Sequence, residues 1–159
     1  MFSLRQLTRR VALTFVLPLT AGVAIAGFAP ANTQALAQTE IGCLALNIYH
    51  EARGESLQGQ KAVAAVTLNR VRDDHFPNSI CAVVWQPYQF SWTHTQKTYF
   101  PTELDAWKQA LSIAESSLDQ KVVAEYENLL YYHSKRVRPE WSKHKRFVAR
   151  VGSHLFYSI

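Results

Sequence analysis

Two glutamates, Glu51 and Glu55, carry the most distinctive chemistry in the sequence. They lie in the stretch Asn47 to Asn69, which reads NIYHEARGESLQGQKAVAAVTLN. An apolar helical pattern runs into Glu51, breaks at Arg53-Gly54-Glu55 and restarts as a second apolar helix. A carboxyl group at the end of a mostly buried helix, beside a glycine-containing turn, is predicted to have a raised pKa and to face a cleft.

Cleavage of a glycosidic bond is a reaction that one such acid can support. The leaving oxygen needs a proton, so a carboxylic acid must stay protonated near neutral pH. Many glycosidases add a second carboxylate, and Glu55 is the nearest one in the sequence. A substrate with an N-acetyl group can do without it, because its acetamide oxygen can stabilise the cationic centre. Glu51 is therefore the predicted catalytic acid, and Glu55 is a substrate contact, a rival acid or a helix cap.

Aromatic and amide side chains that could bind a sugar follow in later segments. Aromatic faces stack on pyranose rings, and amides form hydrogen bonds with their hydroxyl groups. Phe90 fits a core position better, and Asn69 fits a helix end at least as well. For Trp92 and Tyr132 both core and cleft stay open. The predicted substrate-binding residues besides Glu55 are Asn69, Gln89, Phe90, Ser91, Trp92, Tyr131, Tyr132 and His133.

Two helices are predicted to position the glutamates. Apolar residues at i, i+3, i+4, i+7 and i+8 predict a helix from Glu40 to Ala52, with Glu51 just outside the apolar stripe. Gly54 is a predicted stop signal, and it could form a wall of the cleft. A second helix is predicted from about Leu57 to Asp73. The stripe of the first helix consists of Ile41, Leu44, Ala45, Ile48 and Tyr49.

A third helix and a small β element complete the predicted fold. The third helix begins near Pro101 to Asp105, after an aromatic loop. Leu129 to His133 and Phe147 to Tyr157 have the pattern of strands, with Gly152 as a kink or turn. The fold class is therefore α+β, with three main helices followed by a small antiparallel β element.

The first 37 residues have the pattern of a cleaved secretory signal peptide. Arginines precede an uncharged apolar run from Val11 to Phe28, and Ala35-Leu36-Ala37 is a small-x-small cleavage pattern. The alternative is a retained membrane anchor, since the run is about long enough to span a bilayer. Cleavage would leave one domain, residues 38–159, in the periplasm or secreted. It would lower the formal net charge from +5 to +2, because the removed segment holds three arginines and no acid.

The two cysteines, Cys43 and Cys81, lie in the part that remains after cleavage. An even pair in an exported chain predicts one disulfide. Closing this loop would stabilise the fold by roughly 4 kcal/mol in the chain-entropy model. The alternative is a pair of buried thiols. A cysteine metal site is not predicted, because the sequence has no CxxC pair.

Other chemistries fit the sequence less well. His50-Glu51 resembles the start of HExxH, but Gly54 occupies the place of the second histidine. The sequence has no GxSxG elbow, and we expect no metal and no cofactor. The stretch Lys135 to Arg150 carries seven basic residues against one acid, Glu140. It could bind nucleic acid, but export favours an anionic polymer of the cell envelope instead.

Three blocks of the sequence closely resemble the spore cortex-lytic enzyme type of bacterial cell-wall hydrolases. They read YHEARGESLQGQKAVAAVTLNRV, FPNSICAVVWQPYQFSW and LLYYHSKRVRPEWSKHKRFVARVGSHLFYS. The resemblance covers about Ile41 to Ser158, and the EARGE block is its most specific part. It implies a compact, lysozyme-like or resuscitation-factor-like domain. It also implies cleavage of peptidoglycan glycan strands between N-acetylmuramic acid and N-acetylglucosamine, commonly by lytic transglycosylation.

The resemblance assigns the catalytic acid to the first glutamate of EARGE, which is Glu51. Ser56 follows Glu55, and other lytic transglycosylases also place a serine directly after their catalytic glutamate, so Glu55 stays a rival. Two other functions remain as alternatives: an N-acetylmuramoyl-L-alanine amidase and a non-catalytic peptidoglycan-binding module. We expect a monomer that binds glycan strands and that has neither a nucleic-acid partner nor a stable membrane anchor.

Overall fold

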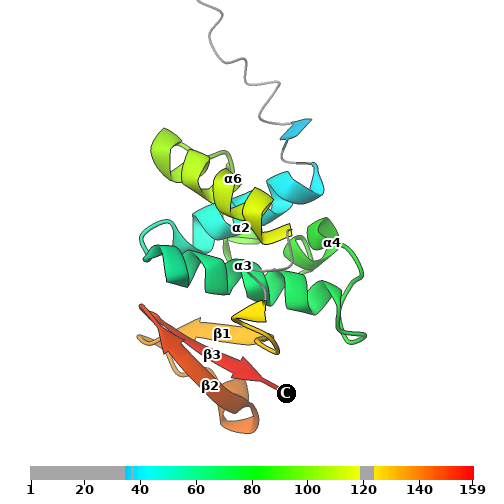
Figure 1. Cartoon of the computed structure of the whole chain (residues 1–159), viewed down its shortest axis with the longest axis vertical. Helices are drawn as coiled ribbons and strands as arrows, with labels where there is room; N and C mark the ends of the chain where they lie inside the picture. The colour runs from blue at the N-terminus through cyan, green and yellow to red at the C-terminus, as the bar shows by residue number, and fades with distance from the viewer. Residues whose placement is uncertain (1–34, 37, 119–123) are drawn as a thin grey trace, which may run out of the picture.

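Helix α3, Leu57–Val71, lies between a layer of helices and a β-sheet (Figure 1). The structure is a computed structural model that describes residues 35–36, 38–118 and 124–159. The predicted signal peptide, residues 1–37, therefore falls outside the described residues except for positions 35 and 36. None of the helices in the described ranges is long and apolar enough to cross a membrane.

Helix α3 can be buried on two sides because its middle consists of small apolar residues. Ser56 caps its start, where the Ser56 hydroxyl accepts a hydrogen bond from the Gly59 N–H at 3.3 Å. Short side chains allow the neighbouring layers to pack close to the helix axis. The fully buried apolar residues of α3 are Ala62, Val63, Ala64, Ala65 and Val66.

The helical layer consists of α2, Glu40–Ala52, and α6, Leu104–Leu118, together with the short α4, Ile80–Val84. Apolar side chains of α2, α3, α4 and α6 form the larger core between these helices. The Tyr49 hydroxyl ties α2 to α6, because it accepts the N–H groups of Thr102 and Glu103, both at 3.1 Å. These contacts fix the last turn of α2, which carries Glu51, against the start of α6.

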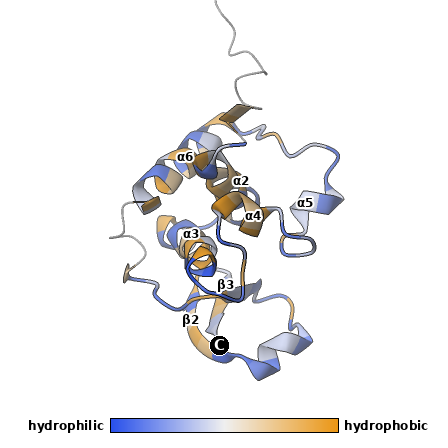
Figure 2. Cartoon of the chain, turned by 90° about the vertical axis from the view of Figure 1, so that its right-hand side faces the viewer, coloured by the Kyte–Doolittle hydropathy of each residue, from blue (hydrophilic) through white to orange (hydrophobic). Residues whose placement is uncertain are grey.

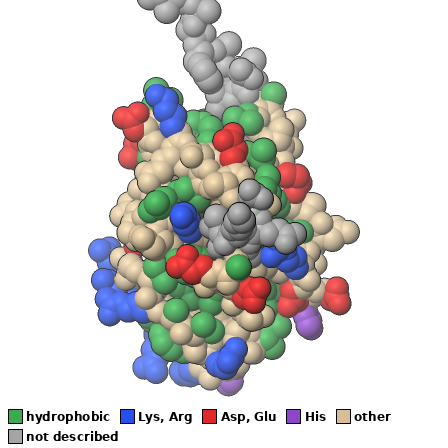
Figure 3. Space-filling view, in the orientation of Figure 1, with side chains coloured by type: hydrophobic (Ala, Val, Ile, Leu, Met, Phe, Trp, Pro, Cys, Tyr) green, Lys and Arg blue, Asp and Glu red, His purple; other side chains and the backbone are tan. Residues whose placement is uncertain are grey.

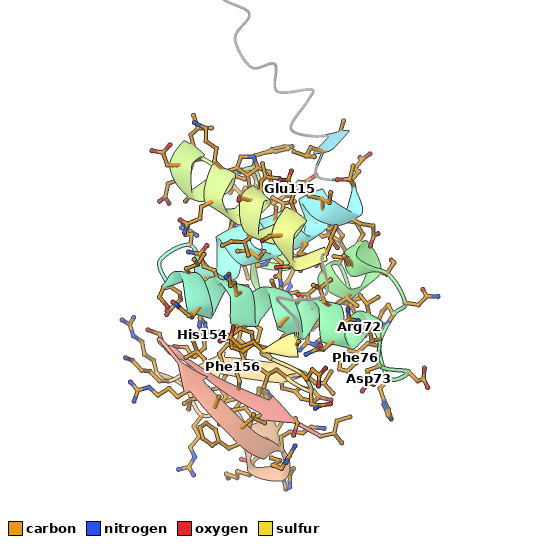
Figure 4. The ribbon with its side chains drawn as sticks, in the orientation of Figure 1. Arg72, Asp73, Phe76, Glu115, His154 and Phe156 are labelled. Atoms are coloured by element: carbon orange, nitrogen blue, oxygen red, sulfur yellow. A yellow bond between two sulfur atoms is a disulfide. The ribbon has the colours of Figure 1, made fainter. Side chains whose placement is uncertain are left out.

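The sheet has three antiparallel strands in the order β1-β3-β2. They are β1, Tyr131–Ser134, β2, Arg146–Val151, and β3, His154–Ser158. The central strand β3 turns Phe156 and His154 toward α3 (Figure 4). Phe156 is fully buried in a second, smaller core with Ala62, Val63 and Leu129.

The segments between the main elements contain short helices. They are α4, α5, Trp92–Thr95, and the 3-10 helix η1, Glu140–His144. Orange apolar residues gather in the helical layer, whereas α5 and η1 are mostly white and blue (Figure 2). The expected disulfide is present, between Cys43 of α2 and Cys81 of α4. The Glu40 carboxylate reinforces this junction by accepting the Ile80 N–H at 2.6 Å.

The α+β fold class is confirmed, and so are the bounds of α2. Helix α3 ends at Val71, two residues before the predicted Asp73, and α6 begins at Leu104. The predicted strand from Phe147 to Tyr157 is a hairpin of two strands that turns at Gly152. The two short helices α4 and α5 were not predicted, because runs of four or five residues are too short to show a helical period.

The predicted helix stop at Gly54 is confirmed, but it does not depend on the special properties of glycine. Helix α2 ends just before it, with Arg53 as its C-terminal cap and a hydrogen bond from the Glu55 N–H to the Ala52 carbonyl at 2.9 Å. Gly54 does not have a positive φ, however, and a Cβ atom there would meet nothing within 4 Å. Neither the turn nor any close approach therefore requires glycine at this position.

Candidate active site

The carboxyl group of Glu51 opens into a cleft of about 510 Å³. One side of the cleft comes from the loop before α5, and the other comes from β1, β3 and the chain that follows β1. In Figure 2, α5 and the short helix between β1 and β2 extend on the same side of the molecule, above and below. The lining residues are Glu51, Arg70, Tyr88, Gln89, Phe90, Ser91, His94, Tyr132, His133, Ser134, Val137 and His154.

Burial raises the pKa of Glu51, as the sequence predicts for a carboxyl group at this helix end. A hydrogen-bonding contribution from the Tyr132 hydroxyl and the positive charge of Arg70 oppose this rise without cancelling it. Glu51 is also the only acidic side chain among the described residues that line the cleft. Its carboxyl group can therefore hold a proton at a higher pH than an exposed glutamate can.

Arg70 of α3 is the one guanidinium group among the described residues that line the cleft. Its Nε donates to the Leu130 carbonyl at 2.8 Å, and its cationic carbon lies 5.5 Å from the centre of the Phe90 ring. Its Nη1 is buried and has no hydrogen-bond partner among the described residues. Arg70 therefore places a fixed positive charge near Glu51, where it favours the carboxylate that forms once Glu51 has given up a proton.

Tyr132 brings a hydroxyl group from β1 to Glu51. Burial, together with the negative charge of Glu51, raises the pKa of this hydroxyl well above its usual value, so it stays neutral and can donate a hydrogen bond. The Tyr132 oxygen is buried and has no partner with regular hydrogen-bond geometry in the described part of the chain. The predicted substrate-binding residue Tyr132 thus lies in the cleft beside the candidate acid.

The loop before α5 supplies the opposite side of the cleft. The predicted residues Gln89, Phe90 and Ser91 all line it, although Phe90 is also 97% buried in the larger core. Tyr88, which was not among the predicted residues, is 88% exposed and has a φ of 64°. The left-handed backbone is uncommon for a large side chain, and here it directs an aromatic ring outward at the edge of the cleft.

Two histidines complete the lining on the sheet side. His133 is held by two hydrogen bonds of 2.9 Å, one to the Ser134 carbonyl and one to the Tyr157 hydroxyl. A carbonyl only accepts, so His133 Nδ1 donates to it, and in the neutral ring Nε2 accepts from Tyr157. His154 packs edge-on against Tyr132, with 5.3 Å between ring centres, and burial lowers its pKa.

Besides Glu55, three of the predicted substrate-binding residues lie outside the cleft lining. Trp92 is 97% buried, stacks on His50 at 4.4 Å and donates its indole N–H to Asn47. Tyr131 lies between Lys145 and Trp141. Their side chains are engaged in packing, so the structure does not bring them to Glu51.

Asn69 is the third of these residues. Its side-chain amide donates to the carbonyls of Tyr126 and Leu129, at 2.9 and 3.1 Å. It borders a separate depression of about 250 Å³ with Arg72 and Asp73, which lie at the other end of α3 from His154 (Figure 4). The alternative role of Asn69, as a polar residue that satisfies backbone groups near a helix end, fits these contacts.

Glu55 does not line the cleft. Its Oε2 accepts the Ser153 N–H at 3.0 Å, and its Oε1 lies 4.0 Å from Nδ1 of His154. Gly152 has a φ of +58°, and a Cβ atom there would collide with Oε2 of Glu55. Glu55 therefore binds the turn of the β2–β3 hairpin, and it has no place beside Glu51 as a second acid of the cleft.

A sequence model described as cell wall hydrolase matches residues 54–157. The chain belongs to the cell wall hydrolase family. The family resemblance predicted from the three sequence blocks is thereby confirmed. The matched range begins just after Glu51 and includes the remainder of the cleft lining. Among the described residues, no group of three or more histidine, cysteine or acidic side chains could hold a metal ion.

Curated relatives in this family include two spore cortex-lytic enzymes. That of Bacillus subtilis strain 168 is 32% identical over 117 residues, which are 74% of this chain and 37% of the relative. That of Bacillus cereus is 32% identical over 119 residues, which are 75% of this chain and 44% of the relative. The chain thus spans less than half the length of these relatives.

Two solved structures of the family have a similar fold. The catalytic domain of the germination-specific lytic transglycosylase SleB from Bacillus anthracis is 32% identical, with a TM-score of 0.61. The similarity covers 76% of this chain and 95% of that domain. The catalytic domain of the SleB protein from Bacillus cereus is 29% identical, with a TM-score of 0.58, over 75% of this chain and 89% of that one.

Several residues that line the cleft were not predicted from the sequence. Arg70 follows Asn69 on a helix, where arginine is usually exposed. Ser134, Val137 and His154 reach the cleft only because the sheet folds against α3. A usable signal existed for Tyr88 and His94, because both lie in or beside the aromatic, amide-rich loop that pointed to sugar binding.

Proposed function

We propose that this protein is an exported lytic transglycosylase that cleaves peptidoglycan between N-acetylmuramic acid and N-acetylglucosamine. Glu51 acts as its single acid and base. The observation that carries this proposal is a partly buried glutamate with a raised pKa, which is the only acid among the described residues that line an open cleft. One of the similar solved structures is the catalytic domain of a lytic transglycosylase, which supports the same reaction.

The reaction begins with proton transfer from the neutral Glu51 carboxyl group to the glycosidic oxygen. The bond from that oxygen to the muramic acid C1 breaks, and the substrate's acetamide oxygen stabilises the positive charge that develops at C1. Glu51, now a carboxylate, then accepts a proton from the muramic acid 6-hydroxyl. The freed oxygen forms a bond to C1 and closes a 1,6-anhydro ring. Glu51 ends in its starting state, and no water is consumed.

Arg70 and Tyr132 support the half of the cycle in which Glu51 is ionised. The positive charge of Arg70 and the hydroxyl of Tyr132 both favour the Glu51 carboxylate. Burial favours the neutral acid. A general acid that must also serve as a base needs these opposing influences, because proton transfer is most efficient when the catalytic pKa lies near the working pH.

The composition of the cleft suits a sugar chain. Tyr88 and Phe90 offer ring faces, and Gln89 and Ser91 offer polar groups that can bind hydroxyl or acetamide groups. Pyranose rings have apolar faces and polar edges, so such a mixed lining matches both.

Export is part of the proposal. It rests on the signal-peptide pattern of residues 1–37 and is supported by the disulfide between Cys43 and Cys81. Disulfides persist in oxidising compartments such as the periplasm or the outside of the cell. Peptidoglycan lies in the same compartment, so enzyme and substrate would meet there.

Product analysis tests the reaction. Purified protein is incubated with isolated sacculi, and the released fragments are analysed by mass spectrometry. We expect fragments with 1,6-anhydro-muramic acid ends. Ordinary reducing ends would instead indicate a hydrolase, and released stem peptides would indicate an amidase. Binding to sacculi without any release would mean that the domain is a binding module.

A further inference from the structure

The chain that follows β1 places three basic residues at the edge of the cleft. Ser134 and Val137 line the cleft, and Lys135, Arg136 and Arg138 lie directly beside them in the sequence. All three basic side chains are exposed. Lysine and arginine side chains gather along the side of the molecule where β1 ends and the β2–β3 hairpin turns (Figure 3).

This basic edge, defined by Lys135, Arg136 and Arg138, is held in place by its backbone. The Lys135 N–H donates to the Ser153 carbonyl at 2.8 Å, and the Val137 N–H donates to the Ser134 carbonyl at 3.0 Å. The Arg136 N–H donates to the Ser134 hydroxyl at 3.3 Å. The segment is therefore a turn fixed against the β2–β3 hairpin, and a ligand need not order it on binding.

The side chains of the basic edge are not neutralised by any part of the chain that the structure describes. None of the ion pairs and side-chain hydrogen bonds of the described residues involves the charged groups of these three residues. Basic residues further along the same stretch are engaged within the protein. They are Lys143, bound to Glu140, Lys145, bound to Tyr131, and Arg146, bound to Ser158.

We propose that the basic edge binds the carboxylates of peptide stems on the glycan strand, so that the enzyme prefers strands that carry peptides. The inference rests on the proposed function. A ligand of the basic edge lies next to whatever fills the cleft, since the cleft residues Ser134 and Val137 alternate with the basic residues along the chain. The sugar rings of the strand are uncharged. Its anionic groups are carboxylates carried on the lactyl side of muramic acid, and these are mostly part of peptide stems.

The two edges of the cleft then bind different parts of the substrate. Tyr88, 88% exposed and in edge contact with His94 at 5.7 Å, offers an aromatic surface to a sugar ring. The basic edge on the sheet side receives the peptide. A strand lying between them would present its muramic acid side chains toward the sheet, which fixes its direction relative to Glu51.

The experiment compares two substrates. Isolated sacculi carry peptide stems, and the same sacculi treated with an amidase give peptide-free strands. The enzyme variant is Lys135→Gln/Arg136→Gln/Arg138→Gln. Exposed charge contacts are each worth roughly a two- to threefold change, so kcat/KM of this variant on peptide-bearing strands should fall by about tenfold. On peptide-free strands, where the amidase leaves one free lactyl carboxylate on each muramic acid, the loss should be smaller, no more than about threefold.

A matched variant removes three cations elsewhere. Lys61, Arg72 and Lys108 lie in the helical half of the molecule and do not line the cleft. Lys61→Gln/Arg72→Gln/Lys108→Gln lowers the net charge by the same amount and should cleave both substrates as the wild type does. If it loses as much activity on peptide-bearing strands as the first variant, only overall charge matters and the proposal is wrong.

Salt provides a test that needs no variant. At about 1 M salt the Debye length is only about 3 Å, so the preference of the wild type for peptide-bearing strands should largely disappear. Equal wild-type rates on the two substrates at low salt would overturn the proposal, and so would an equal loss by the first variant on both. If the wild type cleaves neither substrate to anhydro products, the proposed function itself fails.

Discussion

The two glutamates of the EARGE motif are four residues apart and lie in opposite environments. Glu51, in the last turn of α2, opens into the cleft, and burial raises its pKa. Glu55, at the start of the next helix, is tied to the turn of the β2–β3 hairpin by the Ser153 N–H. The same residue type is thus a candidate proton donor at one position and a structural link at the other, because the surrounding groups differ.

The link made by Glu55 also reaches the cleft. His154 follows the hairpin turn directly, lies 4.0 Å from the Glu55 carboxylate and contacts Tyr132, which faces Glu51. Glu55 therefore helps to place the wall of the cleft opposite the candidate acid. Its contribution to activity should act through position, whereas that of Glu51 should act through the proton.

The largest expected effect is the loss of activity when the proton donor is removed. Glu51→Gln removes the acid while keeping the size of the side chain, and general acid–base catalysis contributes about 10²–10⁴-fold. We expect kcat on sacculi to fall by that factor, with a thermal unfolding curve that shows an intact fold. A folded Glu51→Gln protein that still releases anhydro fragments at the wild-type rate would refute the role of Glu51.

The second effect concerns the β2–β3 hairpin turn, to which the Glu55 carboxylate is hydrogen-bonded. Gly152→Ala forces a left-handed backbone on a residue with a side chain, which costs roughly 1–2 kcal/mol. It also collides with Glu55 Oε2. We expect urea unfolding to show a loss of at least that size. Gly54→Ala is the matched control, because its φ is not positive and a Cβ atom there meets nothing within 4 Å.

The collision can be separated from the backbone cost. In Gly152→Ala/Glu55→Ala the carboxylate is gone, so only the left-handed backbone remains costly. The double variant should therefore be more stable than the sum of the two single changes predicts, since residues in contact are not additive. Additive losses would mean that Glu55 and Gly152 are not in contact in solution.

A third, smaller effect follows from Glu55→Gln. The amide oxygen can still accept the Ser153 N–H, but hydrogen bonds to charged groups contribute about 1 kcal/mol more than neutral ones. We expect a loss of stability of about 1 kcal/mol by urea unfolding. Activity should fall by less than tenfold. A loss of activity as large as that of Glu51→Gln would identify Glu55 as the catalytic acid after all.

The helices could be predicted because their signals are local. The stripe from Ile41 to Tyr49 has the helical period, and it located α2 to the residue at both ends. The same local pattern placed Glu51 at a partly buried helix end. The pairing of Cys43 with Cys81 was predicted because the sequence has only two cysteines and begins with the pattern of a signal peptide.

The role of Glu55 could not be predicted, because it depends on a contact that spans 98 positions, to Ser153. No pattern near Glu55 indicates which turn will be folded against it. Arg70 and His154 reach the cleft for the same reason, since each belongs to a different layer of the fold. Trp92 was included among the substrate-binding residues although its ring is buried. The sequence of a polar loop does not show whether an aromatic ring points outward or into the core.

The smallest expected effect is a pH dependence of stability that distinguishes Glu51 from its glutamine variant. The folded protein holds the proton of Glu51 more tightly than the unfolded chain does, because burial raises its pKa. Below the pKa that Glu51 has in the unfolded chain, its carboxyl group is neutral in both states and does not change the free energy of unfolding. As the pH rises toward the folded pKa, ionisation favours the unfolded chain, and the folded state loses stability.

Glu51→Gln cannot ionise, so it should gain stability relative to the wild type as the pH rises from about 4 toward neutrality. Urea unfolding of both proteins across this range measures the difference. The wild-type kcat/KM should fall on the alkaline side of the same folded pKa, where the free enzyme has lost its acid. A stability difference that stays flat with pH would mean that Glu51 titrates like an exposed carboxyl group, and the contrast between the two glutamates would then have to be explained by geometry alone.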